Sequence, residues 1–141
     1  MFGYTAITSL DLSKFNTSLV TDMSSLFEDS TELTSIDLSN FDTSNTKKMY
    51  GMFRYTNIEK LDLSNFNTSN VDSMANMFEK CSKLTSLNVK SFDTSKVGSF
   101  YRMFDTCRSL KSLDITNFKS DLVTEMGYMF MDWCSLTSLD I

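Results

Sequence analysis

The residues of this 141-residue sequence that could do chemistry are carboxylates that return at one fixed position of a repeated stretch. Each stands between two apolar residues, so in an extended segment its side chain points to the opposite side from theirs. We expect them to form one outward-facing row, with an amide at one place: Asp11, Asp37, Asp62, Asn88, Asp114 and Asp140. Such a row could bind cations or a basic ligand.

Stacked carboxylates repel one another, so the repulsion in this row must be offset. Two unit charges about 5 Å apart cost roughly 1 kcal/mol in water. Hydrogen bonds from neighbouring Ser, Thr and backbone groups are one explanation, and a row of bound cations such as Ca²⁺, or a basic ligand, is the other. Asn88 and Lys90 interrupt the row, which weakens the cation explanation. The sequence leaves both explanations open.

Histidine and several common catalytic motifs are missing from this chain. The sequence has no His, which is the commonest general base and the commonest metal ligand. It also has no glycine-rich phosphate loop and no Gly-x-Ser-x-Gly motif. We therefore expect a protein that is not an enzyme, with no cofactor and no metal site.

The three cysteines do not make a disulfide framework, because their number is odd. Cys81 and Cys107 take the same place in successive repeats, whereas Cys134 is one residue out of step. Equivalent residues of stacked repeats lie about 5 Å apart, which is within the Cα range of a disulfide. Cys81 and Cys107 are therefore expected to form either a disulfide or a ladder of small buried thiols.

A repeat of 25 or 26 residues positions all of these side chains. Its clearest copy is LTSIDLSNFDTSN, residues 33–45, and copies start at Ile7, Leu33, Ile58, Leu84, Leu110 and Leu136. A fixed period of this length is typical of proteins in which each repeat contacts only its neighbours. We predict that residues 1–141 form a single solenoid domain of about five coils, cut from a longer array.

Each repeat contains two patterns of apolar residues. Leu61 and Leu63 alternate with Asp62 as in a strand, and stacking would pair such strands in a parallel sheet. The next apolar residues are spaced by three and four, as on one helical face: Val71, Met74, Met77 and Phe78. We predict a short helix at residues 72–79 and at the equivalent place in each repeat. The predicted fold class is an α/β repeat, with short parallel strands on one face and short helices on the other.

The stretch from Leu33 to Asn45, with the clusters MYGMF and MANMF that follow such stretches, resembles the BspA-like leucine-rich repeat family of bacterial surface proteins. Repeats of that family have about 25 residues, and the resemblance covers essentially the whole chain. It implies a right-handed leucine-rich-repeat-like solenoid. It also implies a secreted or cell-surface location, an anchor outside this fragment, and a role in adhesion and host binding. Phe41 stands where ordinary leucine-rich repeats carry Asn or Cys, so their asparagine ladder cannot be assumed.

The distribution of charge favours some partners over others. The net charge of −5 argues against nucleic acid, because phosphate contacts need a basic face. Residues 47–111 carry eleven bases and six acids between more acidic ends, and this belt is either a solvated face or a site for an acidic partner. No apolar run reaches membrane-spanning length, and we find no signal peptide at the start of the sequence. Ends without polar capping repeats predict end-to-end self-association.

Together these features predict a non-catalytic repeat module of a bacterial cell-surface protein. We expect it to mediate adhesion or protein–protein contact through its strand face, with an unidentified host or cell-surface protein as partner. The alternative is a structural spacer or stalk with no ligand of its own. The predicted ligand-binding face consists of Asp11, Asp37, Asp62, Asn88, Asp114, Thr34, Lys60, Thr85 and Lys111.

Overall fold

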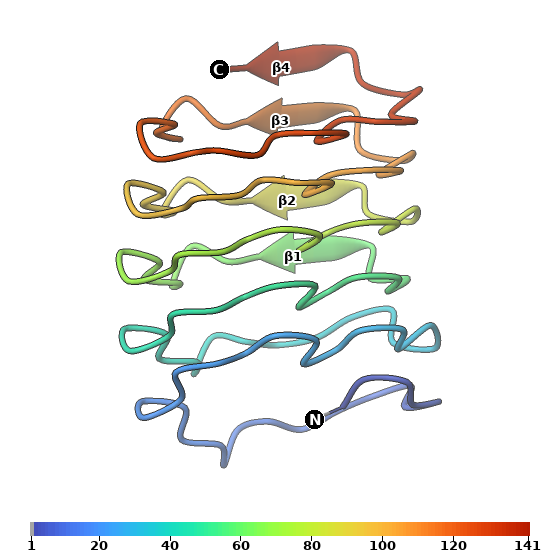
Figure 1. The fold of residues 1–141 in the computed structure, drawn as a ribbon. Helices are drawn as coiled ribbons and strands as arrows, with labels where there is room; N and C mark the ends of the chain where they lie inside the picture. Colours follow the sequence, from blue (N-terminus) through green and yellow to red (C-terminus); the bar gives the residue numbers. More distant parts are fainter. Residues whose placement is uncertain (1) are drawn as a thin grey trace.

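The chain runs as a stack of turns, each set on the one before it (Figure 1). The computed structural model describes residues 2–141. The N-terminus lies at the bottom of Figure 1 and the C-terminus at the top, and the strands lie above one another. We call each repeat a coil, so that coil 1 starts at Ile7, coil 3 at Ile58 and coil 5 at Leu110.

Four strands of three residues each lie in the described part of the chain. They are β1 (Lys60–Asp62), β2 (Ser86–Asn88), β3 (Ser112–Asp114) and β4 (Ser138–Asp140). β1 pairs with β2, and β3 pairs with β4, in parallel. The register sets Leu61 opposite Leu87 and Leu113 opposite Leu139. Residues one period apart therefore lie directly above one another.

The predicted helix at residues 72–79 is wrong, and residues 2–141 contain no helix. Tight turns occupy this stretch instead. The backbone N–H groups of Met77 and Glu79 donate to the carbonyls three residues earlier, at 3.2 and 3.0 Å. The N–H groups of Asn76 and Phe78 instead donate to carbonyls of coil 4, at 2.8 and 2.9 Å. Of these four consecutive backbone N–H groups, which a helix would bond internally, two therefore join coil 3 to coil 4.

Left-handed residues explain why helical spacing of apolar residues builds turns here. Asn76 and Lys80 have φ angles of 60° and 59°, and such residues cannot continue a right-handed helix. Each of coils 1 to 5 contains such a pair: Ser25 and Asp29, Gly51 and Tyr55, Asn76 and Lys80, Arg102 and Thr106, Tyr128 and Asp132. The predicted fold class, an α/β leucine-rich-repeat-like solenoid with helices on one face, is therefore wrong. The described chain consists of short strands, turns and extended connections.

The turn-rich stretches of neighbouring coils, residues 72–80 and their equivalents, form what we call the turn side. They pair in parallel through single bridges, in the order Asp22, Lys48, Ser73, Ser99 and Glu125. From each bridge onward, every second N–H donates to the next coil. The turn side is therefore a second line of inter-coil hydrogen bonds, beside that of the strands.

A ladder of threonines joins the coils between these two lines. Thr68 is fully buried, and its Oγ1 donates to the carbonyl of Asp93 at 3.0 Å while accepting the N–H of the same residue at 2.8 Å. The same two-way contact recurs from Thr17 to Asp42, from Thr43 to Asn67 and from Thr94 to Lys119. One hydroxyl thus satisfies two backbone groups of the next coil.

The core consists of columns of like side chains. Five phenylalanines form a stacked spine with ring centroids 5.6 to 5.8 Å apart: Phe27, Phe53, Phe78, Phe104 and Phe130. Met49, Met52, Met74, Met77 and Met103 are fully buried beside it. Within residues 2–141, no helix is available that could cross a membrane.

Candidate binding surfaces

The strand face presents polar side chains that the strands hold in register. In β1, Leu61 is buried, whereas Lys60 and Asp62 on either side of it are exposed. Lys60 lies opposite Ser86, and Asp62 lies opposite Asn88. The remaining predicted residues of this face are also exposed, apart from the half-buried Asn88 and Asp114: Asp11, Thr34, Asp37, Thr85 and Lys111.

Local hydrogen bonds hold the carboxylates of this face. An Oδ1 atom of Asp11, Asp37 and Asp62 accepts the N–H of the residue two positions later, at 2.9 to 3.0 Å. This backbone hydrogen bond lowers the pKa of each of the three carboxyls below its ordinary value. In Asp114 the hydroxyl of Thr116 has the largest effect in lowering the pKa. Of the two explanations for the row, hydrogen bonding to neighbouring groups is present in the structure.

The two residues that interrupt the row also connect it. Asn88 Nδ2 donates to Asp62 Oδ1 at 3.0 Å, and Lys90 Nζ lies 3.0 Å from Asp114 Oδ2. A hydrogen bond from an amide and an ion pair with an ammonium group thus offset part of the repulsion in the row between coils 3 and 5. Among residues 2–141, no group of three or more His, Cys, Asp or Glu side chains is arranged to hold a metal ion.

Cys81 and Cys107 are buried free thiols, so the disulfide alternative is not formed in this structure. Their Sγ atoms donate to the carbonyls of Phe53 at 3.0 Å and of Phe78 at 3.2 Å. Each thiol is thus directed at the backbone of the preceding coil. Burial raises the pKa of the Cys81 thiol to about 12 and also raises that of Cys107. Cys134 is exposed.

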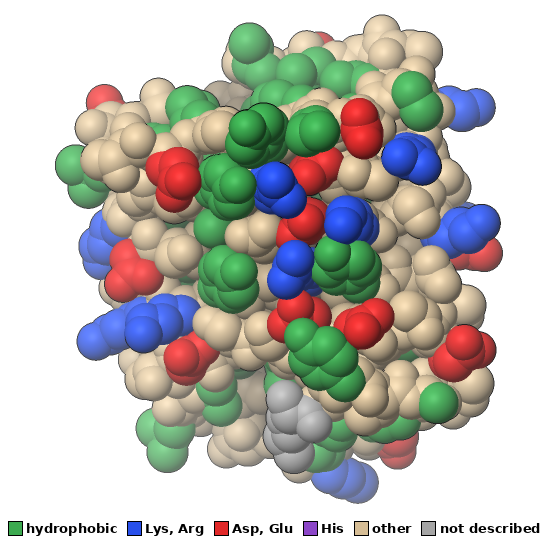
Figure 2. Space-filling view, turned by 45° about the vertical axis from the view of Figure 1, so that its right-hand side comes forward, with side chains coloured by type: hydrophobic (Ala, Val, Ile, Leu, Met, Phe, Trp, Pro, Cys, Tyr) green, Lys and Arg blue, Asp and Glu red, His purple; other side chains and the backbone are tan. Residues whose placement is uncertain are grey.

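The turn side carries a charged cluster that the sequence analysis missed. Glu79 is fully buried in coil 3, between arginines from coils 2 and 4. Arg54 Nε lies 2.6 Å from Glu79 Oε2, and Arg54 Nη1 lies 3.0 Å from Glu28 Oε1. Arg102 Nη1 lies 3.6 Å from Glu79 Oε1 on the other side, and Arg102 Nε lies 3.9 Å from Asp105 Oδ2. Figure 2 shows a face on which acidic and basic side chains meet along the middle, with hydrophobic side chains beside them.

A signal for this cluster is present in the sequence. One charged residue directly follows each of four phenylalanines of the spine: Glu28, Arg54, Glu79 and Asp105. These residues form one column, in which the charges are negative, positive, negative and negative. Aromatic rings contact these cations: the centroid of the Tyr55 ring lies 4.7 Å from Arg54 Cζ and 4.6 Å from Lys80 Nζ, and Arg102 lies over Tyr101 and Tyr128.

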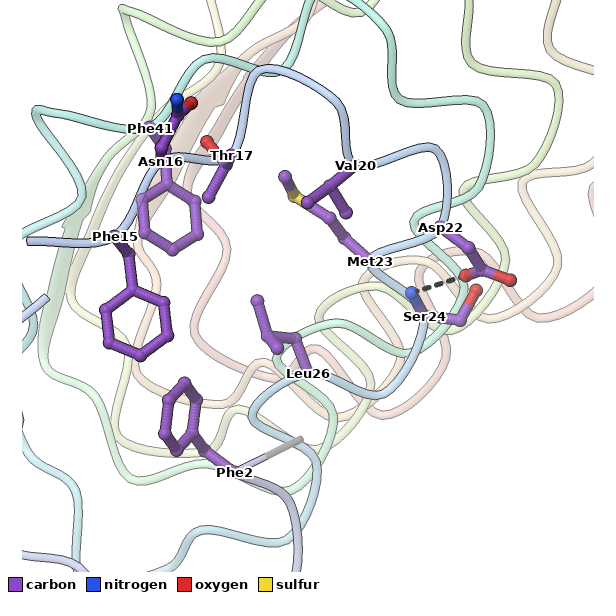
Figure 3. Close-up of a pocket in the computed structure, with 10 residues that line it drawn as sticks. All are labelled: Phe2, Phe15, Asn16, Thr17, Val20, Asp22, Met23, Ser24, Leu26 and Phe41. Carbon is purple, nitrogen blue, oxygen red and sulfur yellow. Dashed lines mark hydrogen bonds between the residues drawn. The ribbon is translucent and has the colours of Figure 1, made fainter.

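An apolar groove opens beneath coil 1, as Figure 3 shows. It has a volume of about 210 Å³ and is lined by Phe2, Phe15, Asn16, Thr17, Val20, Asp22, Met23, Ser24, Leu26 and Phe41. Phe15 is 38% exposed, whereas Met23, at the inner wall, is 2% exposed. The Asp22 carboxylate accepts the N–H of Ser24 at 2.9 Å, at the polar rim.

The comparison with protein families identifies the repeat. The model of the family described as "Mycoplasma protein of unknown function, DUF285" matches the chain twice, over residues 1–86 and 55–140. The chain belongs to this family. The DUF285 description assigns no function, and the narrower resemblance to BspA-like leucine-rich repeats is not part of that match. No curated protein and no solved structure matches the chain.

Proposed function

We propose that the chain is a non-catalytic repeat module that makes protein–protein contacts through its strand face at the surface of a bacterial cell. The observation that carries the proposal is the registered array on β1 to β4, where Lys60 stands opposite Ser86 and Asp62 opposite Asn88. Exposed side chains at constant spacing make a broad, flat surface of the kind that stacked repeats use for binding.

The carboxylates of this face are well suited to contact another protein because their orientation is fixed in advance. Each of Asp11, Asp37 and Asp62 is held by a backbone N–H of its own turn. A side chain that is already ordered loses less conformational entropy when a partner binds. Lys60 and Lys111 stand in the same face and add positive charge between the acids, so the face suits a partner surface of mixed charge.

The proposed location outside the cell is supported by the resemblance to BspA-like leucine-rich repeats, which occur in secreted and surface proteins that adhere to host components. The family to which the chain belongs is described as a Mycoplasma family, which supports a bacterial source. We propose adhesion to a host or cell-surface protein as the role of the strand face.

A solid-phase binding assay tests this proposal. The purified chain is applied to a panel of immobilised extracellular matrix proteins, with serum albumin as the negative control. A variant with Lys60→Ala, Asp62→Asn and Lys111→Ala removes three charges from the strand face, and Asn at position 62 keeps the carbonyl oxygen that accepts the turn N–H, as Asn88 does in coil 4. We expect at least a tenfold loss of binding, whereas Lys47→Ala on the turn side leaves binding unchanged.

The structural spacer is the alternative that this assay addresses. A chain that binds none of the panel, or whose triple variant binds as tightly as the unmodified chain, contradicts adhesion through the strand face. A melting temperature of the triple variant within a few degrees of the original shows that the coils remain stacked.

A further inference from the structure

All five tyrosines of the chain stand on the turn side, and none stands on the strand face. They occupy positions equivalent to those of residues 72–80: Tyr4, Tyr50, Tyr55, Tyr101 and Tyr128. Two of the three arginines, Arg54 and Arg102, lie among them. Tyrosine and arginine are enriched at the centre of protein interfaces, whereas Ser, Lys and Asp are depleted. The turn side therefore has the composition of an interface, independently of the strand face.

We call the part of the turn side in coils 2 to 4 the middle turn face, which consists of residues 47–55, 72–80 and 98–106. Tyr50 is 42% exposed there, although coils 1 and 3 stack on either side of its coil. Its neighbours in the same column, Ser24 and Ala75, are small, so neither covers the ring. On the face that Figure 2 shows, basic side chains lie beside hydrophobic ones over the middle of the stack. An aromatic ring is thus open to a partner in a position that stacking does not cover.

The charges of the middle turn face are basic at the surface and acidic inside. Its three lysines are exposed or half-buried: Lys47, Lys48 and Lys80. Of its three acids, Glu79 and Asp105 are buried and Asp72 is exposed. The equivalent stretches of coils 1 and 5 carry acids and no base: Asp22, Glu28, Asp29, Glu125 and Asp132. This distribution of charge fits an acidic partner over coils 2 to 4.

Two cations around Tyr55 are held in place and keep donors free. Arg54 donates to Glu79 and Glu28 through Nε and Nη1, whereas within residues 2–141 its Nη2 makes no hydrogen bond. Lys80 Nζ donates to the Tyr55 hydroxyl at 2.7 Å, which uses one of its three N–H groups. Both cations lie within 4.7 Å of the centroid of the Tyr55 ring. A carboxylate that approaches this ring meets donors that are already oriented, so binding costs little ordering of side chains.

We propose that the middle turn face binds a short acidic segment of another protein, independently of the strand face. Tyr50 packs against an apolar part of the segment, and Arg54 and Lys80 bind its carboxylates. Coils 2 and 4 are two steps of the phenylalanine spine apart, at 5.6 to 5.8 Å a step, so the face matches about three to four residues of extended chain. A second copy of this chain aligned on coil 3 would set acidic ends against acidic ends, which disfavours it as the partner.

A fluorescently labelled peptide GELEEG is the probe, and GQLQQG, which has the same size and no acidic side chain, is the control. Each is titrated with the full chain, and anisotropy reports binding. We expect GELEEG to saturate below about 1 mM chain and to bind at least tenfold more tightly than GQLQQG. Raising the NaCl concentration from about 0.05 to about 0.5 M should weaken its binding at least tenfold, because salt screens exposed charges.

Variants of the chain locate the site. Lys80→Gln and Tyr50→Ala should each weaken GELEEG binding at least threefold, because each removes one contact of the middle turn face. Lys60→Gln on the strand face and Tyr4→Ala, which removes a tyrosine that is 72% exposed next to acidic coil 1, are the matched controls and should leave binding unchanged. In NMR spectra of the unmodified chain, the amide signals of Tyr50 and Ala75 should shift when the peptide is added.

Four results overturn the proposal. They are no saturation up to about 1 mM chain, equal binding of GELEEG and GQLQQG, a loss with Lys60→Gln as large as that with Lys80→Gln, and amide shifts confined to the strand face. A heparin hexasaccharide is titrated in parallel. If it binds and Lys80→Gln weakens that binding while GELEEG does not bind, the ligand is an anionic glycan, which also overturns the proposal.

Discussion

Replacing the buried hydroxyl of Thr68 with a methyl group is the most direct test of how the coils are joined. Thr68→Val preserves the shape and volume of the side chain and removes one oxygen. That oxygen serves two backbone groups of coil 4, because it donates to the carbonyl of Asp93 at 3.0 Å and accepts its N–H at 2.8 Å. Both groups of Asp93 lose their partner in the variant.

The expected cost follows from this geometry. Leaving a buried donor or acceptor without a partner costs about 1 to 3 kcal/mol. Thr68 is fully buried and Asp93 is half-buried, so water reaches the Asp93 groups only in part. Counting both groups near the lower part of that range, we expect Thr68→Val to lower the free energy of unfolding by about 2 to 4 kcal/mol. Thr68→Ser keeps the oxygen and loses one methyl group, and should cost only about 1 kcal/mol.

Urea unfolding followed by circular dichroism measures both variants. Ser120→Ala is the matched control: Ser120 holds the equivalent position in coil 5 and is exposed, so this change should stay within about 0.5 kcal/mol of the original. A Thr68→Val protein as stable as the original refutes the view that the hydroxyl ladder joins the coils. So does a Thr68→Ser protein that is destabilised as much as Thr68→Val.

Three further predictions concern backbone strain, acid and thiol reactivity. Gly51 has a φ of +58° and an added Cβ meets no atom closer than 3.7 Å, so Gly51→Ala should cost about 1 kcal/mol by backbone strain alone, measured by urea unfolding; an unchanged midpoint contradicts this. The N–H of Ser64 lowers the pKa of Asp62 in the folded chain, so the contribution of this carboxylate to stability is complete above its ordinary pKa of about 4 and is lost as the pH falls through the lowered pKa. The melting temperature should therefore fall as the pH is lowered below about 4. A melting temperature that stays constant over this range argues against the turn hydrogen bonds. A thiol-reactive dye should label Cys134 in the native chain, and Cys81 and Cys107 only after unfolding, because burial raises the pKa of both buried thiols; rapid native labelling at all three sites would show that coils 3 and 4 open readily.

The stacking of equivalent residues could be predicted from the sequence because it depends only on the period. A column of phenylalanines every 25 or 26 residues can be buried in a stack only if the coils lie in register. Pairing of Leu61 with Leu87 and the stacked rings of Phe53 and Phe78, 5.8 Å apart, are the direct result. The outward position of Asp62 also followed, because it lies between two inward leucines.

The turn side could not be predicted, because helices and successive tight turns place apolar residues at the same spacings. Met74, Met77 and Phe78 are buried in the turns, and a helix would bury them as well. The turns differ from a helix in the left-handed backbone conformation of some residues, and residue types such as Tyr55 and Lys80 give no sign of that conformation. Glycine is the usual signal for positive φ, and among the left-handed pairs only Gly51 supplies it.

The candidate sites were predictable to different degrees. The strand-face row was found because one residue type recurs at one position. The salt-bridge cluster was missed because it depends on which coils are neighbours: Arg54 lies in the same column as Glu79, but Arg102 lies three residues before Asp105 and reaches Glu79 from outside that column. The groove was missed because the period of the sequence does not predict which side chains of coil 1 other residues leave uncovered.

The buried carboxylate of Glu79 bears on how a chain of near-identical coils avoids stacking in the wrong order. If coil 2 were skipped during folding, Glu28 would take the place of Arg54 beneath Glu79. Two carboxylates would then share a buried site without the guanidinium between them, which is strongly unfavourable. The apolar columns would accept such an error, because phenylalanine would still meet phenylalanine. A few charged positions therefore give interchangeable coils a fixed sequence of neighbours.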